Sequence, residues 1–185
     1  MRVKQPKAFA FEEFVDTPQV SPYQLKDDGN IPNNRHLPLL IYEGAFKLPA
    51  HDPASVIERV FSANQWTESW RNGIYPFHHY HSTSHEVLGV FSGLATIQFG
   101  GPNGITQTIK AGDVVIIPAG VSHKNLVATV DFGVVGAYPG GRDHDMNYGK
   151  PEERPEADHN ISRVPIPKRD PVYGEDGPLF EHWLD

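Results

Sequence analysis

Short apolar stretches separated by turn residues fill the middle of the chain, from Trp66 to Tyr138. Each stretch is long enough for a β-strand and too short for an ordinary helix, and regularly spaced short strands are typical of an all-β sandwich or barrel. A cluster of glycine, proline and asparagine at residues 100–104 marks a turn between two of the stretches. The pattern predicts strands at 74–81, 85–91, 94–99, 105–109, 113–117, 121–127 and 131–138.

One helical pattern precedes these strands. Residues 37–46 predict a further strand. Asp52 and Pro53 then provide a helix start, because aspartate caps a first turn and proline fits the first helical position. The apolar positions 56, 57, 60 and 61 lie on one side of the short helix that follows. This helix is therefore expected to pack on the outside of a sheet.

The two ends of the chain are richer in proline and charge than the middle. Residues 1–36 contain four prolines and are expected to form an extended N-terminal arm, with one strand at 8–11. Residues 139–185 begin with a charged stretch rich in proline and glycine and end with aromatic residues. They are expected to form a C-terminal arm that packs on the barrel or on a partner subunit. The barrel itself is assigned to residues 37–138.

Histidines alternate along the first strand of this barrel. His79 and His81 project from one face of a regular strand, because successive side chains point to opposite faces. Glu86 follows after a short polar connection, and an antiparallel return would bring it beside the two histidines. Two imidazoles and a carboxylate form a site for a divalent first-row metal.

A second segment carries another histidine after a tight turn. The β-branched residues 114–117 lead into Pro118, Ala119 and Gly120. Proline presets φ and glycine accepts a positive φ, so the chain can turn sharply and present His123 at a defined position.

Together the two segments resemble the two motifs of the cupin superfamily. The first family pattern is met at every position, by Gly73, His79, His81, Glu86 and Gly93. The second is met by Gly112, Pro118, Gly120 and His123. Its final asparagine position holds Val127 here, and an asparagine occurs instead at Asn125. The resemblance covers residues 70–138 closely.

The resemblance implies a fold and a metal centre. The implied fold is a jelly-roll β-barrel, or double-stranded β-helix, with motifs at 73–93 and 112–127, between the two terminal arms. The implied ligands of one divalent transition metal are His79, His81, Glu86 and His123. This donor set leaves Fe, Mn, Ni, Co, Cu and Zn open. It also leaves two positions of an octahedral ion free for other ligands.

Strand alternation nominates residues around the metal. Tyr75 and Phe77 share the face of the histidine pair, and Asn125 shares the face of His123, so these three are candidates for the substrate pocket. The apolar residues on the same faces are assigned to the core: Leu88, Val90 and Val127. The residues assigned to the opposite face, at the surface or an interface, are His78, Tyr80 and His85. Arg71 is expected either to form a structural ion pair or to lie at the cavity mouth. Tyr138 and Arg142, at the end of the barrel, are further candidates for the site.

Composition narrows the range of functions. The chain has 185 residues, no cysteine and a formal net charge of −7. An acidic chain without clustered lysine and arginine is not expected to bind nucleic acid. No apolar stretch approaches the length of a membrane span, and the N-terminal sequence shows no secretory signal pattern. We therefore expect a cytoplasmic protein with a small-molecule ligand and no membrane partner.

The sequence is compatible with two functions. The first is a small-molecule enzyme, either a metal-dependent dioxygenase or an isomerase or lyase, in which Glu86 is a candidate proton acceptor as well as a ligand. The second is a metal-dependent binding or sensing protein without catalysis. Proteins of the resembled family and this size are often dimers, and the long arms favour exchange between subunits. The sequence therefore favours a homodimer.

Overall fold

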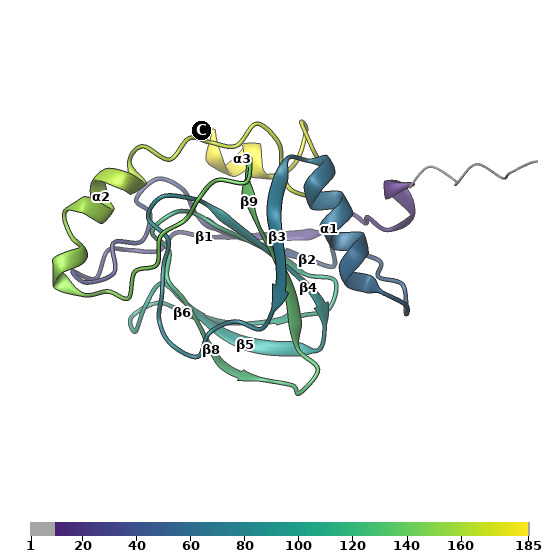
Figure 1. Ribbon diagram of the computed structural model, residues 1–185, viewed down its shortest axis with the longest axis horizontal. Helices are drawn as coiled ribbons and strands as arrows, with labels where there is room; N and C mark the ends of the chain where they lie inside the picture. The colour runs from purple at the N-terminus through teal and green to yellow at the C-terminus, as the bar shows by residue number, and fades with distance from the viewer. Residues whose placement is uncertain (1–9, 185) are drawn as a thin grey trace, which may run out of the picture.

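The computed structural model describes residues 10–184, and its regular structure is mostly antiparallel β-sheet (Figure 1). Six strands form one sheet in the order β1-β2-β7-β4-β9-β3, and three form a second in the order β6-β5-β8. The first sheet comprises β1 (Gln19–Tyr23), β2 (Leu39–Glu43), β3 (Trp66–Asn72), β4 (Glu86–Ser92), β7 (Val114–Ile117) and β9 (Gly133–Pro139). The second comprises β5 (Leu94–Phe99), β6 (Ile105–Lys110) and β8 (His123–Ala128).

The strands at the centre of the large sheet are buried on both faces. One face of β4 and β7, with Leu88 and Val115, packs in the core between the two sheets. The other face, with Val87 and Ile116, packs in a second core under the helices. Burial on both sides explains why these strands are continuously apolar rather than alternating in polarity.

In the described part of the chain, three α-helices and two short 3₁₀ helices accompany the sheets. Their bounds are α1 (Pro53–Ala63), α2 (Glu156–Ile161), α3 (Leu179–Trp183), η1 (Phe11–Glu13) and η2 (Pro151–Glu153). The expected helix is confirmed in α1, where the Asp52 side chain accepts a hydrogen bond from the Ser55 amide. Among residues 10–184, no helix has the length and apolar character needed to cross a membrane.

A glycine lets α1 lie close to the sheet. A Cβ atom added to Gly89 in β4 would stand 2.6 Å from the Ile57 side chain and 3.0 Å from that of Phe61. The apolar side of α1 therefore packs directly against the β4 backbone, as predicted from the spacing of its apolar residues.

The strand predictions hold for most of the barrel. Strands β4 to β9 each begin and end within two residues of the expected positions. The expected strand at 74–81 is wrong. His79 bridges to His123 while the next residue, Tyr80, bridges to Asn147, so the pairing changes partner at successive residues and no ladder forms. The strands β1 and β3 were not expected.

The predictions for the N-terminal side are partly wrong. The strand expected at 37–46 is confined to β2. Of the strand expected at 8–11, the first two residues lie outside the described part of the chain. Phe11 begins a 3₁₀ helix rather than continuing a strand.

The C-terminal segment lies across the outer face of the large sheet (Figure 1). The Trp183 indole donates a hydrogen bond to the Pro38 carbonyl at 3.0 Å, and the Trp66 indole donates to the Arg169 carbonyl at 2.9 Å. Asp170 is fully buried and accepts hydrogen bonds from Tyr42 Oη and the backbone amides of residues 172, 173 and 179. Two features of this segment, α2 and α3, were not predicted, because they are too short to show a helical period.

Candidate metal centre

Backbone pairing joins the two histidine-bearing segments. The His79 amide donates to the His123 carbonyl at 3.3 Å, and the His123 amide donates to the His79 carbonyl at 3.0 Å. The Gly120 amide donates to the His81 carbonyl at 2.7 Å, so the Pro118–Gly120 turn is tied to the same segment. Gly120 has φ of +94°, and an added Cβ would stand 2.3 Å from the Asn33 carbonyl oxygen. Only glycine therefore fits this turn without strain.

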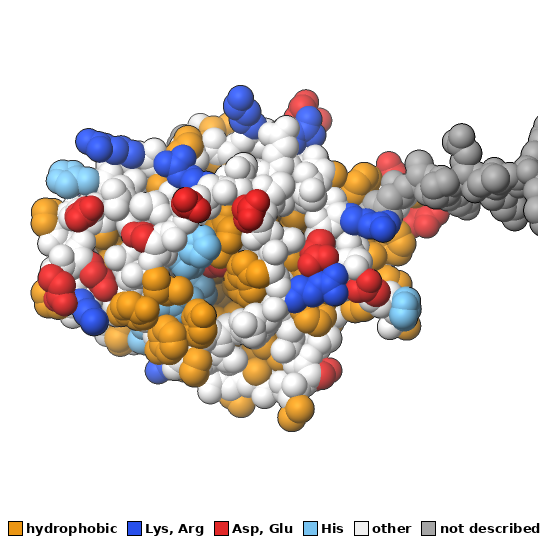
Figure 2. Space-filling view, viewed as in Figure 1, with side chains coloured by type: hydrophobic (Ala, Val, Ile, Leu, Met, Phe, Trp, Pro, Cys, Tyr) orange, Lys and Arg blue, Asp and Glu red, His pale blue; other side chains and the backbone are white. Residues whose placement is uncertain are grey.

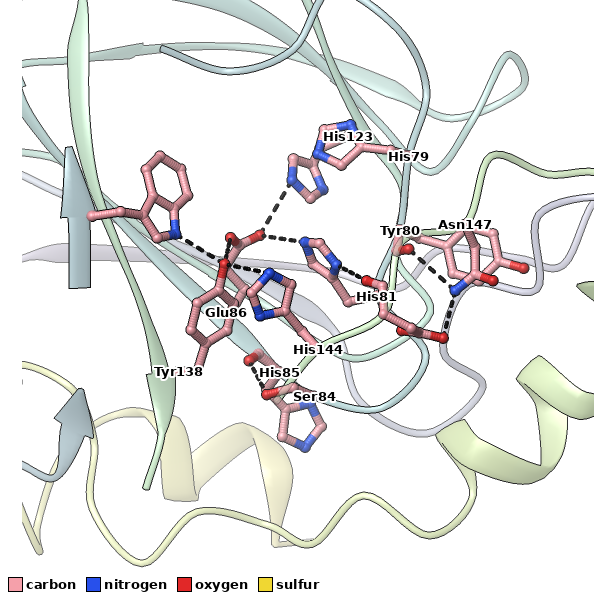
Figure 3. Close-up of polar contacts among 12 residues, drawn as sticks. His79, Tyr80, His81, Ser84, His85, Glu86, His123, Tyr138, His144 and Asn147 are labelled. Carbon is pink, nitrogen blue, oxygen red and sulfur yellow. Dashed lines mark hydrogen bonds and ion pairs between the residues drawn. The ribbon is translucent and has the colours of Figure 1, made fainter. Parts of the chain in front are cut away.

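This pairing brings three buried imidazoles together. Side-chain nitrogens of His79, His81 and His123 all lie within 4.8 Å of one another. Glu86, the first residue of β4, points its Oε2 atom at the group, 3.4 Å from His81 Nε2 and 3.3 Å from His123 Nε2 (Figure 3). The four residues expected as ligands thus meet at one place, with Glu86 beside two of the three histidines.

Backbone carbonyls orient two of the imidazoles. His79 Nδ1 lies 3.1 Å from the Phe77 carbonyl oxygen, and His81 Nδ1 contacts the Asp145 carbonyl oxygen. A carbonyl only accepts hydrogen bonds, so each Nδ1 carries a proton. A neutral imidazole protonated at Nδ1 has a bare Nε2, which is the form that binds a metal.

The charges at the centre depend on one another. Burial raises the pKa of Glu86, but the His81 and His123 imidazoles outweigh it and hold that pKa well below its usual range. Burial lowers the pKa of His81, and the Glu86 carboxylate more than reverses this and raises it. Burial and the neighbouring His123 lower the pKa of His79 to about 3. An ionised Glu86 at 2% exposure therefore requires a positive charge beside it.

The donor set fits a divalent metal. Glu86 Oε2 and His123 Nδ1 are buried and have no hydrogen-bond partner among the described residues. The cationic side chain at the cavity, Arg71, is engaged by Glu58 and Asp52 and does not neutralise Glu86. Imidazole nitrogens and a carboxylate facing one point are the ligands that Fe, Mn, Co, Ni, Cu and Zn accept in proteins.

Tyr138 supports Glu86 from the side away from the histidines. Its hydroxyl donates to Glu86 Oε1 at 3.1 Å and accepts from the Trp70 indole at 2.9 Å. Gly136 makes room for this indole, since an added Cβ would stand 2.2 Å from it. His144 stacks on the Tyr138 ring at 4.1 Å, with Nε2 3.3 Å from the hydroxyl. Burial and the Glu86 charge raise the pKa of Tyr138.

A loop after β9, residues 143–147, contributes groups that the sequence analysis missed. The Asp145 carboxylate accepts from the Ser82 amide at 2.6 Å, the Thr83 amide at 3.2 Å, the Ser82 hydroxyl and Asn147 Nδ2. These bonds hold the loop against the segment that carries His81. No sequence signal marks the loop, because it contacts residues about sixty positions away and has no periodicity.

The centre lies at the wall of a cavity of about 270 Å³. Figure 2 shows histidine and apolar side chains around a hollow on this face of the molecule. The cavity is lined by Trp70, Arg71, Asn72, Gly73, Ile74, Tyr75, His79, His81, Glu86, Leu88, His123, Tyr138, His144 and Met146. Tyr75 is half-exposed at the rim, and Phe77 stacks on it at 4.9 Å without lining the cavity. Asn125 does not line the cavity either.

One core assignment from strand alternation is wrong. Val127 was assigned to the core and is 63% exposed. The register between β5 and β8 shifts, so that Thr96 pairs with Val127 but Ile97 pairs with Asn125. This irregularity reverses the alternation along β8 and turns Val127 outward. Asn125 keeps its Oδ1 atom buried and unpartnered.

The residues assigned to the outer face are mostly buried. His85 is 1% exposed, accepts a hydrogen bond from the Ala119 amide at 2.9 Å and packs on the Trp183 ring. Tyr80 is fully buried and donates to Glu153. Only His78 is partly exposed. The surface assignment is wrong because the C-terminal segment covers this face.

Fold and site together define a histidine-rich double-stranded β-helix protein. Residues 62–126 match the sequence profile of the cupin family. Over 162 residues the chain is 45% identical to the uncharacterized protein YjlB of Bacillus subtilis (strain 168). The match covers 88% of this chain and 95% of YjlB. The chain therefore belongs to the cupin superfamily.

Two solved structures are similar to this chain at a more distant level. Acireductone dioxygenase from Bacillus anthracis with a cadmium ion in its active centre is 17% identical, with a TM-score of 0.37 over 51% of this chain and 63% of that chain. A conserved protein with a double-stranded β-helix domain from Klebsiella pneumoniae is also 17% identical, with a TM-score of 0.34. That match covers 77% of this chain and 97% of the Klebsiella chain. Likeness at this level carries no conclusion about activity.

Proposed function

We propose that this protein is a metal-dependent enzyme acting on a small molecule. The proposed ligands of one divalent transition metal are His79, His81, Glu86 and His123. The observation that carries the proposal is the convergence of three buried imidazoles and one buried carboxylate on the wall of a cavity. A metal bound there would act as a Lewis acid and template for a substrate at its open positions.

The residues around the centre support chemistry of the dioxygenase type or an isomerase or lyase reaction. Glu86 is the proposed catalytic residue, since its carboxylate is ionised, lines the cavity and is placed to accept a substrate proton. Tyr138 holds the other carboxylate oxygen and so fixes the direction in which Oε2 points. The carbonyls of Phe77 and Asp145 fix the imidazoles.

The cavity restricts the substrate to a small molecule. Its volume of about 270 Å³ suits a ligand of a few carbon atoms. Arg71 at the cavity is held by two hydrogen bonds to Glu58, so it is already neutralised. The apolar lining residues Ile74, Leu88 and Met146 favour a substrate with an apolar part.

Metal content and oxygen consumption test the proposal. Protein purified without a histidine tag should contain about one equivalent of a transition metal by mass spectrometry, and H79A and H123A should lose it. H78A is the matched control, because this partly exposed histidine precedes His79 and is not part of the cluster. The Fe(II) form should consume oxygen with a diol or enol substrate if the reaction is oxidative.

Other results would favour the alternative or refute the proposal. Metal-dependent binding of a metabolite that is recovered unchanged would indicate a sensing protein. Equal metal content in H79A, H123A and H78A would refute the metal centre itself. The homodimer and the cytoplasmic location stay predictions, which light scattering and cell fractionation would test.

A further inference from the structure

A second cavity lies behind the metal centre. Its volume is about 300 Å³, and none of its lining residues lines the first cavity. It is formed where the start of β4 and the end of β9 meet the C-terminal segment. The lining residues are Asn64, Gln65, Trp66, Ser84, His85, Pro139, Gly140, Arg142, Val164, Pro165, Ile166, Pro167, Lys168 and Arg169.

The lining is cationic although the chain is acidic. Three of its residues are Arg142, Lys168 and Arg169, and none is aspartate or glutamate, in a chain of net charge −7. Within residues 10–184, Arg142 and Lys168 form no ion pair. Arg169 pairs with the exposed Glu175, and exposed pairs of this kind are weak. The cavity therefore has positive charge available for a ligand.

The Arg142 guanidinium is held in place at this cavity. Its Nε atom donates to the Thr83 carbonyl at 2.7 Å, next to Ser84 and His85 in the chain. This single bond uses one of five N–H donors of the side chain. The remaining donors are free to bind an anion through two parallel hydrogen bonds, as guanidinium groups do with carboxylate and phosphate.

A buried histidine, His85, forms part of the inner wall of the cavity. His85 Nδ1 accepts a hydrogen bond from the Ala119 amide, so the proton of the neutral ring is on Nε2. This Nε2 atom is buried and faces the Pro165 backbone at the wall of the cavity. Figure 3 shows the His85 ring directed away from the metal-facing histidines. His85 therefore adds a buried N–H group to the cationic lining of this cavity.

We infer that this second cavity binds a small organic anion. The anionic group, a carboxylate or a phosphate, binds Arg142 and Lys168, with the His85 donor at the inner wall. The apolar body of the ligand packs on Trp66 and Ile166. The inference does not rest on metal binding or on the proposed activity, because no lining residue is a proposed metal ligand.

Calorimetric titration with phenyl phosphate, benzoate and inorganic phosphate tests this inference. Metal-loaded protein should bind at least one of the two organic anions saturably below about 10 mM. K168Q and R142Q should each weaken that binding about tenfold or more, because each removes a charged hydrogen-bond donor. R163Q is the matched control, since Arg163 is exposed and does not line the cavity. It should leave the affinity unchanged.

The same titrations distinguish other binding places. Tighter binding of phenyl phosphate than of inorganic phosphate would support the apolar wall. H79A should bind the organic anion as the unaltered protein does, because the second cavity is separate from the metal centre. Unchanged affinity in K168Q, loss of binding in H79A, or equal weakening by R163Q would each overturn the inference. K168Q alters an exposed side chain and should fold normally, which thermal unfolding would verify.

Discussion

Replacing Tyr138 with phenylalanine should weaken metal binding without removing any ligand. The change deletes the hydroxyl that donates to Glu86 Oε1 at 3.1 Å and leaves the ring in place. It also leaves the Trp70 indole without its acceptor. Glu86 would then be free to rotate, and its charge would lose one of the groups that stabilise it.

The expected size of the effect follows from this single bond. A hydrogen bond to a charged group contributes roughly 1.5–3 kcal/mol. At about 1.4 kcal/mol per factor of ten, the metal affinity of Y138F should fall roughly 10- to 100-fold, which is the range found for groups that orient metal ligands. Competition against a chromophoric chelator measures the affinity directly.

A second tyrosine provides the control for Y138F. Tyr148 is 47% exposed beside the cavity mouth, and none of its hydrogen bonds uses the hydroxyl. Y148F should therefore bind metal as tightly as the unaltered protein. If Y138F also keeps its affinity within about twofold, the hydroxyl does not orient Glu86 and the reasoning is refuted.

Three further predictions concern packing, pH and an ion pair. G89A should destabilise the fold by about 1–3 kcal/mol in urea unfolding, because the added Cβ would stand 2.6 Å from the Ile57 side chain. G73A is the control, since an added Cβ at Gly73 has open space around it and should not cause this packing penalty. Metal affinity should fall on dialysis as pH drops through the imidazole range, because the Glu86 carboxylate raises the pKa of His81 and a protonated imidazole cannot bind metal. Metal affinity unchanged down to about pH 4 would contradict ligation by His81. Hydrogen bonds from Arg154 lower the pKa of Asp27, so this ion pair stabilises the fold above about pH 4 and its contribution is lost as pH falls through the lowered pKa. The D27N variant should therefore lower the free energy of unfolding by roughly 1 kcal/mol at pH 7 and by almost nothing near pH 2. Urea unfolding at each pH measures both values.

Most of the correct predictions came from short-range patterns in the sequence. The strands β4 to β9 follow from apolar runs between turn residues, and the cluster of His79, His81 and His123 follows from motif spacing. Predictions from the alternation of side chains along a strand were wrong wherever the strand departs from a regular β-ladder. The register shift in β8 turned Val127 outward, and the change of bridge partner at Tyr80 broke the expected first strand.

Groups supplied by distant irregular segments could not be predicted. His144 and Asp145 reach the centre from a loop that follows β9, and their contacts with residues 81–83 join positions about sixty apart. The burial of His85 depends on Trp183 near the end of the chain. Such contacts depend on how a proline-rich segment folds back over the sheet, which has no periodic signal in the sequence.

The two backbone hydrogen bonds between His79 and His123 couple metal binding at this cluster to local unfolding of the two segments. These two amides are protected from solvent exchange only while the two segments stay paired. Breaking the pair would separate two imidazoles in a single event, so any ion held by both opposes that event. Deuterium uptake at these two amides should therefore slow when metal is added, while uptake at distant exposed turns stays the same.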